Sequence, residues 1–94
     1  EMTVGLLKVA LHIPDCNSLK EKRRVLLSLR DLLKNRFNIS LAEVEGQDKW
    51  QRTILAIASV GTERLMVDKG LAKIVDFIRE FKRVELLDYQ VELL

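Results

Sequence analysis

The sequence predicts a small α+β domain with its elements in the order β-α-β-β-α-β. Four short segments show the alternating or continuous apolar pattern of strands: residues 3–13, 37–45, 50–60 and 84–93. Two longer segments, residues 18–36 and 62–82, space their apolar residues at the period of a helix instead. The chain has 94 residues with one proline and four glycines, so a single domain spanning residues 1–94 is expected, without long linkers.

The first strand is expected to lie in the middle of the sheet. Its odd-numbered positions from Gly5 to Ile13 form an unbroken apolar face, whereas the even-numbered positions from Val4 to His12 form a mixed face. Strands this rich in apolar residues are more often central than at an edge. The strand stops at Pro14.

Residues 18–36 should form an amphipathic helix. Ser18 fits an N-cap, and Glu21 three residues later completes a capping box. With the helical period, one side of this helix collects apolar side chains: Leu19, Val25, Leu26, Leu29, Leu32 and Leu33. Lys22 and Arg36 also fall on that side, one near each end, so they must snorkel to solvent or pair with acids.

The first helix concentrates the positive charge of the chain. Between Ser18 and Arg36 there are seven Lys or Arg against two acids, which gives +5, whereas the whole chain has a formal net charge of +2. Charge gathered on one element usually indicates a partner, whose identity the charge does not give. The helix could contact nucleic-acid phosphates without reading the sequence of bases, and the alternative is a solvated helix face. The cations that would contact RNA are Lys20, Arg23, Arg24, Arg30 and Lys34. Leu27 lies among them, as a lone surface leucine or as a contact residue.

Residues 37–60 predict an antiparallel hairpin with Gly46–Asp48 as its turn. The second arm is apolar on both faces and should be central. In the first arm, Glu43 and Glu45 are expected on one side, as a solvated strand face or as counter-ions for a basic neighbour.

The second helix should begin with Thr62 as its N-cap and extend to about Lys82. Its buried stripe is expected to consist of Val67, Leu71, Ile74, Phe77, Ile78 and Phe81. Gly70 lies beside this stripe and is expected to allow close approach to the sheet or to the other helix. The last strand alternates apolar and polar residues, with Leu87, Tyr89, Val91 and Leu93 on one face.

Right-handed crossovers in both β-α-β halves leave one natural arrangement, the ferredoxin-like sandwich. It has a four-stranded antiparallel sheet with the first and third strands in the middle and both helices on one face. If the mixed face of the first strand is the uncovered face, Leu6 and Ala10 are exposed there with part of the third strand, whose orientation the pattern leaves open. Such an apolar patch would make the protein a homo-oligomeric interaction module, a homodimer in its simplest form.

Enzymatic chemistry finds little support in the sequence. Acylphosphatases share this size and topology, but their phosphate cradle needs glycine and arginine in the first loop. Residues 12–17 read His-Ile-Pro-Asp-Cys-Asn, and Asp15 would repel phosphate, so an acylphosphatase-like hydrolase is a distant alternative. His12 and Cys16 lack a second His or Cys to complete a zinc set, so we expect incidental roles for them and no metal, cofactor or catalytic residue.

The aromatic residues give a mixed indication about RNA. The RNA recognition motif has this topology and stacks bases on aromatics of its two middle strands. Here the first strand has no aromatic and the third has only Trp50 at its start, so base reading on the open sheet is not expected. Trp50 is interpreted as an aromatic at the core edge with its indole N–H satisfied nearby. The alternative is a polar cluster at one sheet end: Lys22, Arg36, Asp48, Trp50 and Arg52.

The expected location is the cytoplasm. One cysteine excludes an internal disulfide and suits a reducing cytosol. No apolar run approaches the roughly 18 residues that a membrane span needs. The strand-like N-terminus also lacks the pattern of a signal peptide.

Several runs together carry a family resemblance. They are Ser-Leu-Lys-Glu-Lys-Arg at 18–23, Gln-Asp-Lys-Trp-Gln-Arg at 47–52, and shorter matches at 12–14, 35–38, 42–44 and 87–89. With these runs the chain resembles the YlxP-like family of small bacterial proteins of unassigned function. The resemblance implies a ferredoxin-like fold and a bacterial cytosolic protein without established catalytic residues. Family members are often encoded near translation and ribosome-maturation factors, which implies a connection to RNA or the ribosome.

Overall fold

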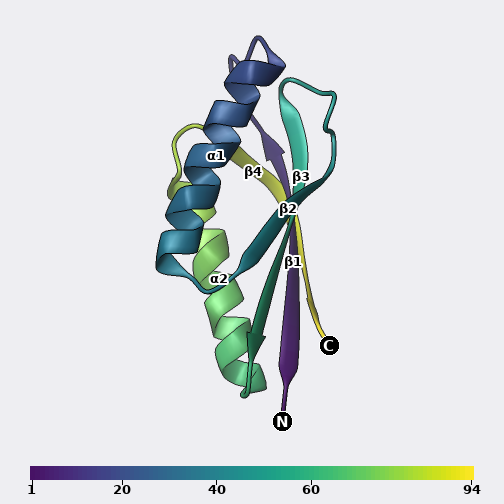
Figure 1. Cartoon of the computed structure of the whole chain (residues 1–94), viewed down its shortest axis with the longest axis vertical. Helices are drawn as coiled ribbons and strands as arrows, with labels where there is room; N and C mark the ends of the chain where they lie inside the picture. Colours follow the sequence, from purple (N-terminus) through teal and green to yellow (C-terminus); the bar gives the residue numbers. More distant parts are fainter.

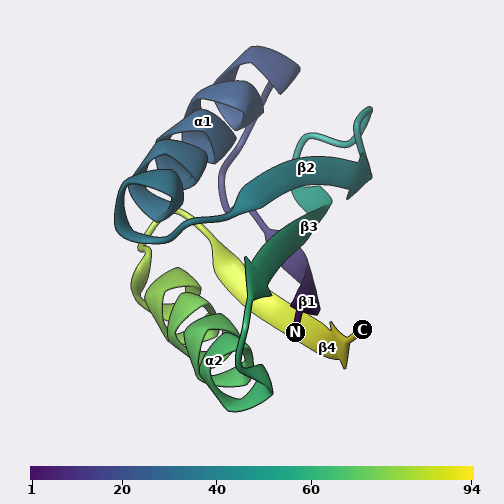
Figure 2. The ribbon, with the colours of Figure 1, turned by 60° about the horizontal axis from the view of Figure 1, so that its bottom comes forward.

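A four-stranded antiparallel sheet forms one layer of the computed structural model, which describes residues 1–94, and two helices form the other layer (Figures 1 and 2). The elements in chain order are β1 (Thr3–His12), α1 (Leu19–Arg36), β2 (Ser40–Glu45), β3 (Arg52–Gly61), α2 (Arg64–Glu80) and β4 (Glu85–Leu93). The strand order is β2-β3-β1-β4, and Figure 2 shows both helices on the same side of the sheet. This arrangement confirms the predicted ferredoxin-like fold.

The central strand β1 separates the core from the open face by simple alternation. Leu7, Val9 and Leu11 are fully buried under the helices, whereas Lys8 on the opposite side is exposed. The mixed face of β1 is therefore the uncovered one. The structure also decides the orientation of β3: Thr53, Leu55 and Ile57 are buried, and the residues between them lie on the open face.

Helix α1 begins as its sequence predicts. The Glu21 backbone N–H donates to Ser18 Oγ at 3.0 Å, which satisfies one of the free donors of the first turn. The Glu21 carboxylate reaches back to the N–H of Asn17, at 3.2 Å, rather than to that of Ser18. On the apolar side, Leu32 is 42% exposed, so the buried stripe is narrower than the sequence pattern indicates.

Helix α2 differs from the prediction in two places. Its N-cap is Glu63, which makes no side-chain capping bond, so Thr62 as the N-cap was wrong. The reason is that β3 stays paired with β1 as far as Gly61, and the chain has not yet turned at Thr62. Gly70 does not permit close packing either, because a Cβ there would meet no atom within 4 Å. That role belongs to Gly5, where a Cβ would lie 2.7 Å from Val67 Cγ1.

Strand β4 contains a bulge that the alternating pattern conceals. Leu11 pairs with Leu86 but Ala10 pairs with Asp88, so Leu87 is the extra residue. Leu87 is 52% exposed, whereas Leu86 packs against the core. The prediction that Leu87 continues the regular alternation of Tyr89, Val91 and Leu93 was therefore wrong.

The two ends of the chain meet at one end of the sheet (Figure 1). The Val4 N–H donates to the Leu94 carbonyl at 3.3 Å, and the Leu94 N–H donates to the Val4 carbonyl at 2.7 Å. The β2–β3 turn lies at the opposite end, because Thr3 pairs with Gly61 and His12 pairs with Arg52. Neither helix is long and apolar enough to cross a membrane.

Candidate nucleic-acid interface

The five cations predicted to contact RNA stand on the outer surface of α1. All five are exposed: Lys20, Arg23, Arg24, Arg30 and Lys34. Arg30 makes the one ion pair among them, at 3.5 Å to the neighbouring Asp31, and both of these side chains are largely solvated. An exposed pair of that kind contributes little. The set is therefore not neutralised by carboxylates of the protein itself.

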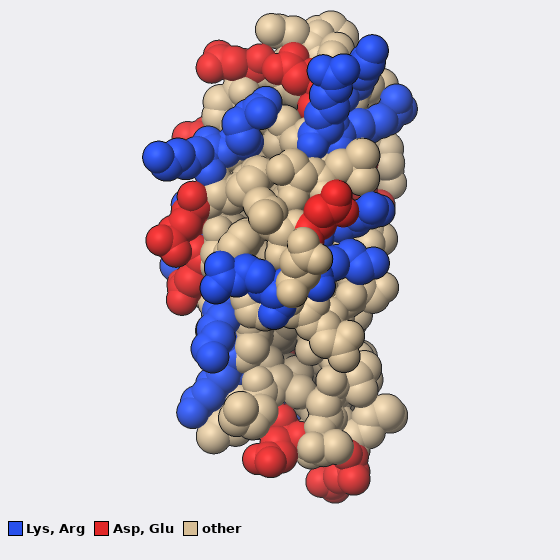
Figure 3. Space-filling view, turned by 60° about the vertical axis from the view of Figure 1, so that its left-hand side comes forward, with Lys and Arg blue, Asp and Glu red and all other residues tan.

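The face that includes the helices carries many basic side chains. Figure 3 shows Lys and Arg along most of its height, with Asp and Glu mainly at the two ends and along one edge. The cations form several groups separated by uncharged surface, with one acidic group among them. This spacing suits contacts to successive phosphates along a nucleic-acid backbone.

Lys22 belongs to α1 but has a different role from the exposed cations. Its side chain is 2% exposed, and Nζ donates to the carbonyls of Gly46 at 2.5 Å and Lys49 at 2.7 Å. Nζ also lies 2.8 Å from Glu43 Oε2, to which Thr53 Oγ1 donates a hydrogen bond. The ammonium thus has three acceptors for its three N–H groups. Its pairing with an acid confirms one of the two outcomes predicted for Lys22.

The sequence did not single out Glu43 as the partner of Lys22. Glu43 and Glu45 were expected on one side of β2, but a bulge separates them: Glu43 pairs with Leu55 and Glu45 with Ile54. Glu45 lies on the open face, where its Oε2 is 4.0 Å from Lys8 Nζ. The usable signal was that Lys22 falls on the apolar side of its helix, where an unpaired charge would be costly.

The polar cluster at the sheet end forms in part. Lys22 holds the β2–β3 turn, and Asp48, Trp50 and Arg52 are exposed on or beside that turn. Arg36 does not join them: it lies at the far end of α1, about 21 Å along the helix from Lys22. Its guanidinium carbon is instead 5.3 Å from the centroid of the Phe77 ring.

Trp50 is not packed at the core edge. Its side chain is 53% exposed. The interpretation as a core-edge aromatic was therefore wrong. The hairpin turn is two residues longer at this end than the strand pattern indicates, because β3 begins at Arg52 and leaves Trp50 and Gln51 in the turn.

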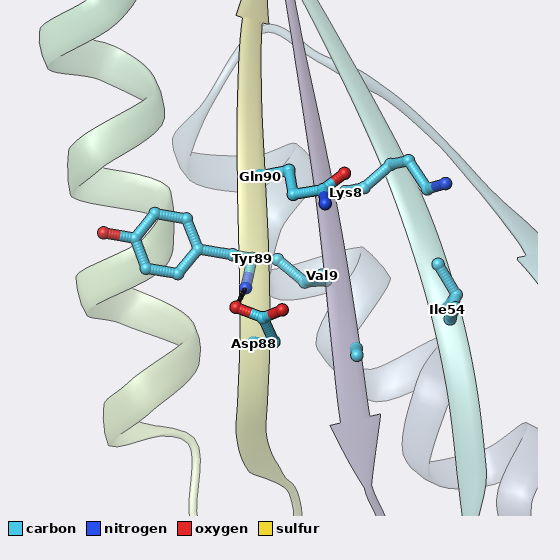
Figure 4. Close-up of a pocket in the computed structure, with 7 residues that line it drawn as sticks. Lys8, Val9, Ile54, Asp88, Tyr89 and Gln90 are labelled. Carbon is cyan, nitrogen blue, oxygen red and sulfur yellow. Dashed lines mark hydrogen bonds between the residues drawn. The ribbon is translucent and has the colours of Figure 1, made fainter.

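The open face of the sheet offers a different chemistry. A hollow of about 130 Å³ lies over β1, with Lys8, Ile54, Asp88 and Gln90 around it (Figure 4). Figure 4 shows Tyr89 turned away from this hollow, toward α2. The open-face positions of β4 are polar, and three of the four are acidic: Glu85, Asp88, Gln90 and Glu92. This acidic edge disfavours phosphate binding on the open face.

His12 and Cys16 are placed apart in separate surroundings. His12 Nδ1 lies 2.5 Å from Glu85 Oε1, on the open face. Cys16 is buried, and its thiol donates to the Ser18 carbonyl at 3.4 Å. The two side chains do not face one another as a nucleophile and its base would.

Known proteins match both the sequence and the fold. Residues 4–91 match the family model described as "Protein of unknown function (DUF503)". The chain is 39% identical over 82 residues to the uncharacterized protein YlxP of Bacillus subtilis (strain 168), covering 87% of this chain and 89% of that protein.

Among solved structures, the de novo designed protein Foldit4 superposes with a TM-score of 0.58 at 10% identity, over 100% of this chain and 97% of that one. A mutant of SnoaB, a cofactor-independent oxygenase from Streptomyces nogalater, reaches 0.49 at 15% identity, over 98% of this chain and 90% of that one. At 10% identity, the likeness to Foldit4 shows the fold alone. The family match and the YlxP identity together confirm the resemblance, and the chain belongs to the DUF503, or YlxP-like, family of proteins of unknown function.

Proposed function

We propose that this protein is a non-enzymatic accessory domain of the bacterial cytoplasm that binds structured RNA, such as ribosomal RNA, through α1. The observation that carries the proposal is the set of exposed cations on α1, of which only Arg30 has an ion-pair partner, the solvated Asp31. Binding of this kind rests on phosphate neutralisation and on the shape of the RNA helix, not on base reading.

The fold presents these cations on a fixed helix. The Ser18 cap orders the first turn, and the buried Lys22 ties the same end of α1 to the β2–β3 turn. Three of the five predicted contacts are arginines, whose planar guanidinium groups can hydrogen-bond a phosphate through two N–H groups at once. The acidic edge of β4 lies on the other face of the sheet, so a polyanion is directed toward the helices.

The test compares two double variants of equal charge change. Arg23 and Arg30 are seven residues apart and lie on one side of α1, whereas Lys69 and Lys73 are exposed on α2. Fluorescence anisotropy with a labelled short RNA duplex, across a series of salt concentrations, should show that Arg23→Glu with Arg30→Glu weakens binding more than tenfold. The slope of log affinity against log salt should fall by about 2, one for each lost phosphate contact.

The α2 control, Lys69→Glu with Lys73→Glu, should change the affinity much less. Circular dichroism and thermal unfolding should show that both double variants are folded. Equal RNA binding by the α1 variant and the parent protein would exclude α1 as the contact surface.

A second candidate is a homodimer formed through the open sheet face. It is favoured by the apolar middle of that face, where Leu6, Ala10, Ile54 and Ala56 have no cover. A twofold axis along the strands would place the two middle strands of one copy over those of the other. Sedimentation velocity at micromolar concentration should then show a dimer that Ile54→Lys converts to monomer, with RNA affinity unchanged. A parent protein that sediments as a monomer rules this candidate out.

A further inference from the structure

The β2–β3 turn carries the single tryptophan of the chain in an unusual position. Trp50 is 53% exposed, at the end of the sheet where α1 begins. Tryptophan is highly buried on average, so a largely solvated indole on a turn is an informative exception. About half of its surface is thus open to a ligand.

The backbone around Trp50 is held in place on both sides. Before it, the Lys49 carbonyl accepts from the buried Lys22 ammonium, and the Lys49 N–H donates to the Gly46 carbonyl at 2.9 Å. After it, the Gln51 carbonyl accepts from the Ile13 N–H at 2.8 Å, and the Gln51 side chain donates to the Cys16 carbonyl at 3.1 Å. The backbone that carries the indole is thus already ordered, so the turn loses less conformational entropy when a ligand stacks on the indole.

The charges beside Trp50 favour an anionic ligand. Lys49 and Arg52 flank it, are exposed and make no ion pair, while Asp48 is the one acid between Gln47 and Arg52. The Lys22 contacts also tie the turn to the end of α1 that carries Lys20 and Arg23. A flat aromatic surface bordered by cations matches a nucleotide, whose base stacks while its phosphates pair with the cations.

We propose that Trp50 stacks on an unpaired nucleobase of the same RNA whose phosphates contact α1. This inference rests on the proposed RNA binding and adds a preference to it. A base inside a duplex is stacked on its neighbours and cannot meet the indole, whereas a base in a loop or bulge can. The preferred ligand is therefore an RNA stem with an adjoining loop or bulge, not an uninterrupted duplex.

The experiment compares two RNAs that share a stem: a short hairpin with a single-stranded loop, and the blunt duplex of the same stem sequence. Because Trp50 is the sole tryptophan, its fluorescence reports on its own contacts. The hairpin should quench this fluorescence, and the duplex should leave it nearly unchanged. By anisotropy, Trp50→Ala should weaken hairpin binding about tenfold while duplex binding stays the same. Trp50→Phe, which keeps an aromatic ring, should retain most of the hairpin affinity.

The outcomes separate this inference from the proposed function. A parent protein that binds both RNAs equally, or a Trp50→Ala variant that binds the hairpin as tightly as the parent, overturns the stacking role and leaves α1 binding intact. Loss of hairpin affinity in Trp50→Ala, combined with no effect of the Arg23 and Arg30 reversals, supports the stacking role and rejects α1 as the contact. A parent that binds neither RNA overturns both. Thermal unfolding should be unchanged in Trp50→Ala, because the side chain is not part of the core.

Discussion

The two helices cover the same sheet but are attached to it by different physical means. Near its start, α1 is held by a buried ammonium, since Lys22 donates to two turn carbonyls and pairs with Glu43. Helix α2 is held by close apolar packing, since Gly5 and Gly61 leave room for Val67 against the sheet. No side chain of α2 forms a hydrogen bond or an ion pair with the sheet. Both helices bury apolar side chains in the core, but α1 adds directional contacts at its start, whereas α2 depends on the space left by two glycines.

The difference in attachment is accompanied by a difference in packing. Between α1 and the edge strand β2 lies a groove of about 400 Å³, with Leu26, Leu27 and Leu41 among its lining residues and Arg23 and Arg30 at its border. Helix α1 is fixed by the polar anchor at its start and by buried Val25, Leu29 and Leu33 along its length. Its outer side carries the exposed cations and Leu27, which is 48% exposed.

The strongest test of this contrast is the replacement of Lys22. Lys22→Met keeps the apolar stem but removes the ammonium, which leaves Glu43 without its charge partner and two turn carbonyls without their donor. We expect a loss of about 3 kcal/mol in the free energy of unfolding, measured by urea denaturation. Hydrogen exchange should show greater loss of protection in α1 than in α2.

The matched control for this replacement is Lys20→Met, which removes an exposed ammonium from the same turn of α1. Its effect on unfolding should stay within about 0.5 kcal/mol. If Lys22→Met proved as mild as Lys20→Met, the buried contacts would not be what holds α1.

The attachment of α2 is tested by adding one methyl group. Gly5→Ala would place a Cβ 2.7 Å from Val67 Cγ1 and 2.8 Å from Leu71 Cδ1, so the helix must move or the side chains must repack. Overpacking of this kind costs about 1–3 kcal/mol, measured as before. Gly70→Ala is the control, because its Cβ meets open space, and it should instead stabilise by about 0.5–1 kcal/mol as helix propensity improves. A neutral Gly5→Ala would contradict the close-packing account.

The smallest expected effects concern the first turns of the two helices. Ser18→Ala removes the acceptor for the Glu21 N–H and should destabilise by about 1 kcal/mol. Glu63→Ser introduces a capping hydroxyl at the start of α2, where none exists, and should stabilise by a few tenths up to about 1 kcal/mol. The midpoint of thermal unfolding should fall for Ser18→Ala and rise for Glu63→Ser. Shifts of the same sign would contradict the account in which only the first helix has a side-chain cap.

Local patterns in the sequence were sufficient for the order of elements, the position of β1 and the cap of α1. Each depends on residues close together in the chain, such as Ser18 with Glu21. The misplaced features depend on partners far away in sequence. The bulge at Leu87 is set by pairing with β1, and the close approach at Gly5 is set by Val67. Periodicity alone contains no information about such register shifts.

The residues of the candidate site show the same difference between features set locally and features set by distant partners. The exposed cations of α1 could be named from helical spacing, because a charged residue opposite an apolar stripe faces solvent. The partners of Lys22 could not, because Glu43 and the turn carbonyls lie far from it in sequence, and no local pattern marks the bulge at Val44 that leaves Glu43 on the helix side and puts Glu45 on the open face. The exposure of Trp50 could not be predicted from the sequence either, since it depends on where β3 begins pairing with β1.

The hydrogen bonds between Val4 and Leu94 make the fold suited to circular permutation. A few added residues could splice these neighbouring ends, and new ends could be opened between Gln47 and Asp48 with every helix and strand left whole. In such a permuted chain no peptide bond would join the two arms of the hairpin. The Lys22 ammonium, which donates to Gly46 on one side of the opening and to Lys49 on the other, would then connect them.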